Sequence, residues 1–135
     1  ASHPNALAPG KRPYHTIVPT ILLEHGMPVL SIGVVGGIMQ PQGQIQILHH
    51  VLNGAGIRAA IEAPRFRLLG DGQVTAEPDL HSADTAALAA AGYEVVNADK
   101  VDFGGAQAVL RRDGGLSAAS DPRRDGVAIV ATVGD

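Results

Sequence analysis

The sequence contains no cysteine and no tryptophan, and its 135 residues include only two phenylalanines and two tyrosines. The lack of cysteine excludes disulfides, thiolate metal ligands and a cysteine nucleophile, although it leaves the cellular compartment open. The shortage of aromatic rings excludes an aromatic-rich core and a surface on which nucleic-acid bases stack. The core must therefore be built mainly from valine, isoleucine, leucine and alanine.

Basic charge and long apolar runs are also scarce. The net charge is −3, whereas proteins that bind nucleic acid usually present a basic surface. The longest apolar run, from Val29 to Ile38, is interrupted by Ser31 and by glycines, and it is far shorter than the roughly 20 residues that span a bilayer. We therefore expect neither a nucleic-acid partner nor a membrane segment in this chain.

Enough apolar material is present for one domain, or one part of a domain. Apolar residues make up 45% of the chain and charged residues 17%, which is the composition of a folded protein. No repeat, low-complexity tract or internal linker divides it. The first 13 residues, ASHPNALAPGKRP, are rich in proline and glycine, which predicts a surface loop that enters from an upstream segment. We expect the chain to be a fragment.

Hydrophobic patterning predicts an α+β domain built from hairpins rather than regular βαβ units. The predicted strands are 15–23, 29–35, 66–69, 73–76, 93–96, 106–110, 116–120 and 127–133, and the predicted helices are 42–53, 56–62 and 82–91. The first strand has the pattern of one buried on both faces, but Pro19 cannot donate to a ladder, so this strand should lie at an edge or contain a bulge. In the first helix, Ile45, Leu48 and Val51/Leu52 are predicted to face the core.

Most candidate catalytic side chains favour a structural role. No G-x-S-x-G motif places a serine for attack, and Ser31, Thr16 and Thr20 lie in strand-like runs. His49 and His50 are adjacent, so on a helix they point about 100° apart and do not form the i, i+4 pair of a zinc site. We therefore expect no metal and no cofactor. The acidic and basic residues between Asp121 and Asp125 predict a surface turn with local hydrogen bonds.

Two adjacent glycines, Gly36 and Gly37, stand where a strand ends and a helix begins. Free backbone N–H groups converge at such a position, and two of them together bind an oxyanion. A plain tight turn explains the same glycines equally well. Spacing alone leaves both interpretations open.

Five strings taken in order resemble the small subunit of γ-glutamyltransferases, and they extend over nearly the whole chain. The strings are NALAPGKRP (5–13), PTI (19–21), GVVGG (33–37), EAPRF (62–66) and ASDPRRDG (119–126). The resemblance implies the N-terminal-nucleophile (Ntn) hydrolase fold, an αββα sandwich formed jointly by a large and a small subunit cut from one precursor. Residues 1–135 would be the C-terminal part of the small subunit, with the large subunit and the rest of the small subunit as partners.

The resemblance also implies site residues. In the family, a threonine that begins the small subunit attacks the γ-glutamyl amide; this chain lacks that threonine, so we expect it to be inactive alone. Gly36 and Gly37 match the glycine pair whose N–H groups form the oxyanion hole. His15 and Thr16 occupy the positions of two serines that bind the substrate carboxylate in many members, and they are expected to line the acyl pocket.

The expected enzyme cleaves a γ-glutamyl or related acyl amide through an acyl-enzyme and passes the acyl group to water or an amine. Val34-Val35 and residues 38–43 depart from the usual family strings, which favours the branch that includes acylases and small-amide hydrolases. One alternative is a catalytically inactive half-domain that is only structural or binds a partner, and another is an unrelated α+β binding module. Because its sheets lack partners, the chain should expose apolar surface and associate with another chain.

Overall fold

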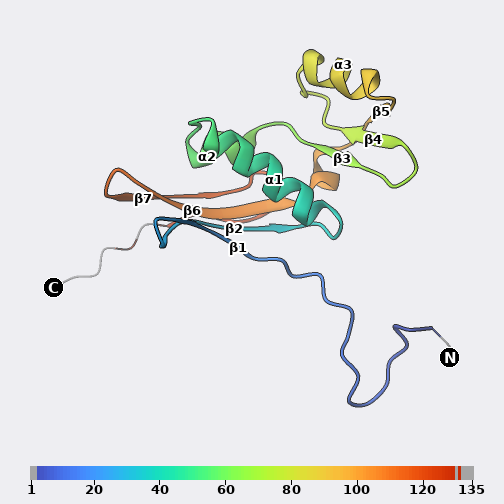
Figure 1. Ribbon diagram of the computed structural model, residues 1–135, viewed down its shortest axis with the longest axis horizontal. Helices are drawn as coiled ribbons and strands as arrows, with labels where there is room; N and C mark the ends of the chain where they lie inside the picture. Colours follow the sequence, from blue (N-terminus) through green and yellow to red (C-terminus); the bar gives the residue numbers. More distant parts are fainter. Residues whose placement is uncertain (1–2, 130, 132–135) are drawn as a thin grey trace.

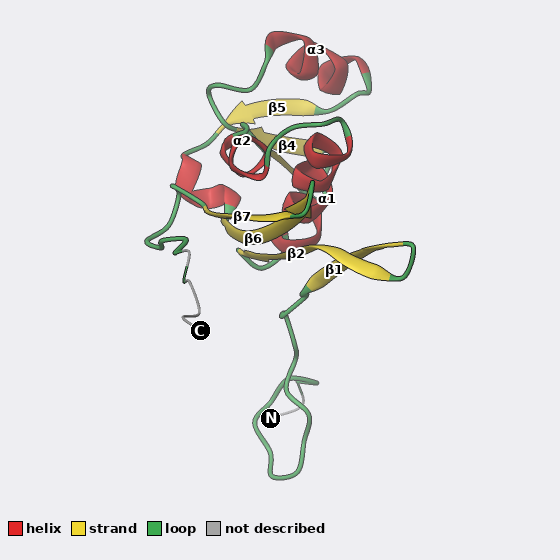
Figure 2. Ribbon diagram, turned by 90° about the vertical axis from the view of Figure 1, so that its left-hand side faces the viewer, coloured by secondary structure: helices red, strands yellow, loops and turns green. Residues whose placement is uncertain are grey.

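The computed structural model describes residues 3–129 and 131, which form two sheets separated by helices. In chain order the elements are β1 (Thr20–Glu24), β2 (Met27–Val35), α1 (Met39–Leu52), α2 (Ile57–Glu62), β3 (Phe66–Leu68), β4 (Gln73–Ala76), α3 (Ser82–Ala90), β5 (Glu94–Asn97), the 3-10 turn η1 (Lys100–Phe103), β6 (Gly105–Arg112) and β7 (Gly115–Ser120). Strand orders are β1-β2-β6-β7 in the larger sheet and β3-β4-β5 in the smaller. Figures 1 and 2 show α1 and α2 on one face of the larger sheet, with the smaller sheet beyond α1 and α3 outermost.

The core lies between the larger sheet and the helices α1 and α2. Side chains alternate between the two faces of a strand, and the register places Ile32, Ala108 and Ala119 side by side on the helical face. All three are buried, and Ile47 of α1 and Ile61 of α2 pack into the same cluster. This aliphatic core matches the composition, since the only aromatic side chain among the buried apolar residues is Phe103.

No helix covers the other face of the larger sheet within the described part of the chain (Figure 1). The cross-strand row there consists of Ile21, Ser31, Val109 and Ala118, and all four side chains are exposed. Leu116 adds a further exposed apolar side chain to this face. An exposed apolar face of this kind is typical of a surface that another structure covers.

Two glutamines of α1 attach the smaller sheet to the helix. Gln42 accepts from the Leu68 N–H at 2.8 Å and donates to the Leu68 carbonyl at 3.2 Å. Gln46, one turn later, accepts from the Phe66 N–H at 3.0 Å and donates to its carbonyl at 2.8 Å. The two side-chain amides thus pair with the free edge of β3 much as a neighbouring strand would.

The first strand is shorter and more exposed than predicted. β1 begins at Thr20, directly after Pro19, and residues 15–19 are extended chain outside any sheet. The prediction of a strand buried on both faces was wrong, because Pro19 ends the ladder and β1 lies at the sheet edge. The edge position and an irregularity between Leu22 and Leu23 confirm the alternatives drawn from Pro19.

The buried face of α1 also differs from the prediction. Val51 is buried and Leu48 packs against the core, as predicted, but Ile45 and Leu52 are both 68% exposed, and Ile47 is buried although it was not predicted to be. The helix turns this way because Gly43 lies against β2: a Cβ at this position would be 3.2 Å from Val34 Cγ1. The closest approach of α1 to β2 is therefore at a residue without a side chain, and the spacing of apolar residues does not predict it.

The other predicted elements are present, with two corrections. Strands β4 and β5 are parallel and joined by α3, so the chain contains one βαβ unit among its hairpins. Residues 127–129 and 131 form no strand, and positions 130, 132 and 133 of that predicted strand lie outside the described residues. No helix in the described part is both long and apolar enough to cross a membrane.

Candidate active site

The glycine pair forms the bend between β2 and α1. Gly36 has φ +128° and Gly37 has φ +58°, values that residues with a side chain rarely adopt. Both carbonyl groups join the first turn of the helix, where Gly36 O accepts from Met39 N at 3.0 Å and Gly37 O accepts from Gln40 N at 3.1 Å. The bend therefore requires glycine at position 36, where a Cβ would also meet Gly104, and it favours glycine at position 37.

The N–H groups of this bend, unlike its carbonyl groups, make no hydrogen bond among the described residues. Among the described residues, neither the Gly36 N–H nor the Gly37 N–H donates a hydrogen bond. The first turn of α1 contains no acidic residue, and Ile38 at the N-cap offers no side-chain acceptor. An uncompensated helix N-terminus with two free amides is a place where negative charge is stabilised.

Gly104 lies directly behind the bend. A Cβ on Gly36 would be 3.0 Å from the Gly104 Cα, and a Cβ on Gly104 would be 2.0 Å from the Val35 carbonyl oxygen. Real Cβ atoms do not approach a backbone oxygen so closely. The two backbones therefore pack together only because both positions are glycine, and sequence analysis did not identify Gly104.

His15 and Thr16, the predicted pocket residues, lie in the exposed extended segment before β1. No contact joins either of them to the glycine pair in the described structure, so their role stays a prediction. The end of their segment is nevertheless attached to α1. Thr20 Oγ1 donates to Gln44 Oε1, and Gln44 Nε2 donates to the Val18 carbonyl. Gln44 lies outside the apolar face predicted for this helix, but it is buried in this contact.

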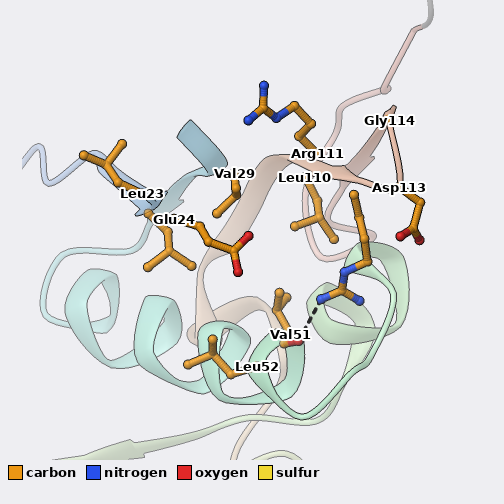
Figure 3. Close-up of a pocket in the computed structure, with 11 residues that line it drawn as sticks. Leu23, Glu24, Val29, Val51, Leu52, Leu110, Arg111, Asp113 and Gly114 are labelled. Atoms are coloured by element: carbon orange, nitrogen blue, oxygen red, sulfur yellow. Dashed lines mark hydrogen bonds between the residues drawn. The ribbon is translucent and has the colours of Figure 1, made fainter. Parts of the chain in front are cut away.

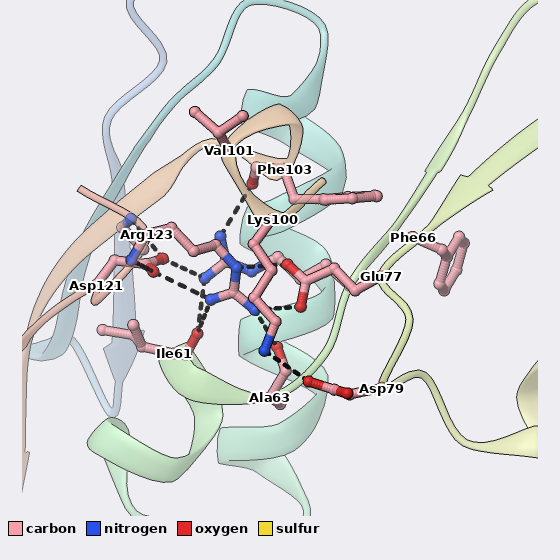
Figure 4. A network of polar contacts seen from close by, with 12 residues as sticks. Ile61, Ala63, Phe66, Glu77, Asp79, Lys100, Val101, Phe103, Asp121 and Arg123 are labelled. Carbon is pink, nitrogen blue, oxygen red and sulfur yellow. Dashed lines mark hydrogen bonds and ion pairs between the residues drawn. The ribbon is translucent and has the colours of Figure 1, made fainter. Parts of the chain in front are cut away.

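Four charged residues form a buried cluster at the ends of segments that are distant in the sequence: Arg65 precedes β3, Glu77 follows β4, and Asp121 and Arg123 follow β7 (Figure 4). Arg65 and Asp121 make an ion pair at 2.7 Å, and Arg123 binds Asp121 at 3.0 Å and both oxygens of Glu77 at 2.5 and 2.8 Å. Two positive charges thus meet two negative charges. The prediction of a surface turn at 121–125 was wrong for Asp121 and Arg123, because their partners Arg65 and Glu77 come from distant parts of the sequence.

Backbone groups bind several of the remaining polar atoms of this cluster, whereas Arg65 Nε is buried and has no hydrogen-bond partner among the described residues. Asp121 accepts from the N–H groups of Ala106 and Arg123 at 2.9 and 3.0 Å, and Arg65 donates to the Phe103 and Ile61 carbonyls at 3.1 and 2.8 Å. Phe103, at the end of η1, and Ala106, near the start of β6, lie on either side of Gly104, which is behind the glycine bend. Ile61 lies in α2. The cluster therefore fixes the strand and loop ends of the domain relative to one another.

Burial and charge compete within the cluster. Burial opposes ionisation of Asp121, but the hydrogen bond from the Arg123 N–H, the charge of Arg65 and the Ala106 N–H outweigh it, so the pKa of Asp121 lies below its ordinary value. Burial lowers the pKa of Arg65. For Arg123, burial is outweighed by the hydrogen bonds to Glu77 and Asp121, and its pKa is raised. Asp121 and both arginines remain charged near neutral pH.

The large cleft in Figure 3 lies at the other end of α1. It has a volume of about 820 Å³ and is lined by Val51 and Leu52 from the end of the helix, together with Glu24, Arg111 and Arg112 from the sheet. A 14-residue helix is about 21 Å long, so this cleft is distant from the glycine bend. It is therefore not part of the candidate site at the bend.

Three histidines gather elsewhere, around a second pocket of about 780 Å³ between α1 and α3. His49, His50 and His81 line it beside Asp79 and Asp84. Their arrangement does not provide a metal site: no group of three histidine, cysteine or acidic side chains in the described residues is placed to hold an ion.

Comparison with known proteins places this geometry in a family. The sequence model of the family "Gamma-glutamyltranspeptidase" matches residues 1–131. The oxamate amidohydrolase proenzyme of Klebsiella pneumoniae is 35% identical over 93% of the chain and 26% of its own length. The crystal structure of cephalosporin acylase from Bacillus halodurans superimposes with a TM-score of 0.81 at 38% identity, over 93% of this chain and 24% of that one.

A third similar structure is the γ-glutamyltranspeptidase from Pseudomonas nitroreducens complexed with L-DON, with a TM-score of 0.77 and 28% identity. It is matched over 98% of this chain and 70% of that chain. The present chain spans only about a quarter of the length of the curated proenzyme relative. These neighbours confirm the α+β fold as part of an Ntn-hydrolase sandwich. The chain therefore belongs to the gamma-glutamyltranspeptidase family, which the ordered sequence motifs indicated.

Proposed function

We propose that residues 1–135 are the C-terminal part of the small subunit of an amide-cleaving Ntn enzyme, and that Gly36 and Gly37 form its oxyanion hole. The reaction begins when a threonine hydroxyl outside this chain attacks the acyl carbon of an amide. A C–O bond forms between the threonine oxygen and the acyl carbon, and the carbonyl oxygen becomes negative. The C–N bond of this tetrahedral intermediate then breaks, and the amine leaves with the proton that the threonine hydroxyl gave up. Water or another amine takes the acyl group from the threonine ester in the second half.

The observation that carries this proposal is the pair of unengaged N–H groups at the start of α1. Each is a donor that needs no reorganisation when charge develops on the substrate oxygen. Removing one such donor typically costs about 10²- to 10³-fold in kcat, or about 3 to 4 kcal/mol. His15 and Thr16 would line the acyl pocket, since Gln44 attaches their segment to the helix that carries the bend.

The substrate class we favour is a compact acyl amide rather than glutathione. Two relatives matched over 93% of this chain, at 35% and 38% identity, are named for oxamate and for cephalosporin, whereas a glutathione hydrolase proenzyme that is 41% identical is matched over only 46% of the chain. An imidazole at His15 in place of a serine hydroxyl changes the size and the donors of the proposed acyl pocket. A panel of γ-glutamyl, oxalyl and glutaryl anilides, compared by kcat/KM, will rank these acyl groups; a preference of tenfold or more for γ-glutamyl would overturn this assignment.

The oxyanion role is tested by replacing Gly37 with glycolic acid in the intact enzyme that contains this chain. This change converts one amide N–H into an ester oxygen and adds no side chain. We expect kcat to fall about 10²- to 10³-fold with the fold retained. Glycolic acid in place of Gly26, in the β1–β2 turn, is the matched control and should leave kcat unchanged. Wild-type turnover after substitution of Gly37 would refute the role.

An inactive binding half-domain predicts a different result. On our proposal, this chain alone hydrolyses no anilide, and addition of the upstream polypeptide with its threonine restores product. A complex that assembles correctly, keeps that threonine and still has no amidase activity on the panel would favour the non-catalytic alternative.

A further inference from the structure

We propose that Gly104 is a positioning residue for the oxyanion hole, and that it acts by fixing the orientation of the peptide plane between Val35 and Gly36. The inference depends on the proposed function of the Gly36–Gly37 bend. Gly104 itself contacts no substrate in this proposal. It sets the direction of a donor that does.

The geometric reason is the trans peptide bond. In a trans peptide the C=O and N–H groups point in opposite directions, and the described chain contains no cis peptide bond. The Val35 carbonyl oxygen lies on the Gly104 side, where a Cβ of residue 104 would meet it at 2.0 Å. The Gly36 N–H of the same peptide therefore points away from Gly104.

Gly104 has a fixed position because its neighbours are anchored on both sides. Before it, the Phe103 carbonyl accepts from Arg65 Nη1 at 3.1 Å, and the Phe103 side chain is fully buried. After it, the Ala106 N–H donates to Asp121 Oδ2 and the Ala106 carbonyl accepts from the Asp121 N–H, both at 2.9 Å. The buried charge cluster thus holds the two residues that flank Gly104 and so fixes Gly104 behind the bend.

The backbone and the neighbouring atoms at Gly104 leave no space in which a side chain could be accommodated. Its φ of +73° disfavours any side chain, and Val34 Cγ1 occupies the space 3.4 Å from a Cβ there. An added methyl group must therefore displace the Val35 oxygen and rotate the peptide plane. The Gly36 N–H would then tilt from the position in which it meets the developing oxyanion.

The test compares Gly104→Ala with Gly26→Ala in the intact enzyme. Gly26 has a similar φ of +79° but open space around its Cβ position, so it controls for backbone strain alone. After active-site titration, we expect Gly104→Ala to lower kcat about 10- to 100-fold with KM changed less than threefold. Gly26→Ala should keep the wild-type kcat per titrated site.

A second readout separates positioning from general damage. A boronic acid in which boron replaces the carbonyl carbon of the acyl group forms a tetrahedral adduct with the threonine hydroxyl, and one of its oxygens occupies the oxyanion hole, whereas a substrate-like carboxylate inhibitor forms no such adduct. For Gly104→Ala, the loss of boronate affinity should follow the loss of kcat/KM, and the carboxylate inhibitor should bind as in the wild type. Equal losses for both inhibitors, or a wild-type kcat, would overturn the proposal.

If Gly104→Ala yields no folded enzyme, Arg124→Ala decides the question. The Arg124 side chain packs behind Gly105 and donates to the Val101 carbonyl at 2.7 Å, and it is only half-buried. Its removal should lower kcat about threefold or more with the same inhibitor pattern, and an unchanged kcat would refute the positioning role.

If glycolic acid at Gly37 is harmless, the oxyanion hole itself is refuted; if only the Gly104 and Arg124 changes are harmless, the positioning inference alone fails.

Discussion

Arg123 donates hydrogen bonds to both carboxylate oxygens of Glu77, although 46 residues separate the two in the sequence. Both side chains are almost fully buried. Charges taken out of water in this way are costly unless each is paired with an opposite charge and hydrogen-bonded. The pair and its neighbours Arg65 and Asp121 therefore behave as one unit in which no member is dispensable.

We expect Glu77→Gln to destabilise the folded enzyme by about 3 to 5 kcal/mol, because it leaves two buried guanidinium groups with one carboxylate. Chemical denaturation of the intact enzyme measures this change. Glu62→Gln is the control, since Glu62 pairs with Arg58 on the surface and exposed pairs contribute little. Equal destabilisation by the two substitutions would contradict the buried-cluster interpretation.

Asp121 should also give stability an acid limit. Its folded pKa lies below the usual value, which is about 3.9 in an unfolded chain, so the folded state favours the carboxylate. This stabilisation is complete above about pH 5 and is lost as the pH falls below 4 through the folded pKa. Urea midpoints between pH 2.5 and 6 should fall less steeply for Asp121→Asn. Asp79→Asn, in the exposed pair with Lys100, should retain the wild-type slope.

The glutamine contacts predict a local change in hydrogen exchange. Gln42→Ala together with Gln46→Ala removes the acceptors of the Leu68 and Phe66 N–H groups, so exchange at these two amides should accelerate tenfold or more, a loss of about 1.4 kcal/mol or more of protection. The Leu69 N–H is the internal control, because it donates to the Gln73 carbonyl at 2.8 Å. Unchanged exchange at Phe66 and Leu68 would show that the edge of β3 is protected in another way.

The uncovered sheet face predicts where the upstream polypeptide binds. Val109 on this face and Val96 on β5 have nearly equal exposure, 42% and 43%, so lysine at each position tests location rather than exposure. We expect Val109→Lys to prevent assembly with the upstream polypeptide in co-purification, because it places a charge in an apolar interface. Val96→Lys should assemble normally. Assembly of both variants would exclude this face as the interface.

Sequence patterns predicted the elements whose signals are local. The hairpins around residues 25 and 113 and the two helices after the glycine pair are defined by turn residues and by spacing within one segment. The glycine bend was located for the same reason: a strand end, two glycines and a helix start are adjacent in the chain.

The errors arose where packing between distant segments decides the outcome. Gly43 turns α1 toward Val34 and leaves Ile45 outside, and no periodicity within the helix encodes that approach. Likewise, Arg65 and Asp121 lie 56 residues apart, so each resembles a surface charge when its own segment is considered alone. Gly104 gave no sequence signal beyond being a glycine beside another, because the oxygen it accommodates belongs to β2.

The glutamine pairing on β3 has a geometric limit. Four residues of an α-helix advance about 6.0 Å, whereas two residues of a strand advance about 6.6 to 6.8 Å, so the two repeats are nearly commensurate for a single step. A third rung would be out of phase by more than an ångström. At that rung the chain has His50 and Pro64, which border a pocket instead of pairing. The helix therefore pairs with the strand at two successive positions, Gln42 with Leu68 and Gln46 with Phe66, and the pairing ends where the two repeats diverge.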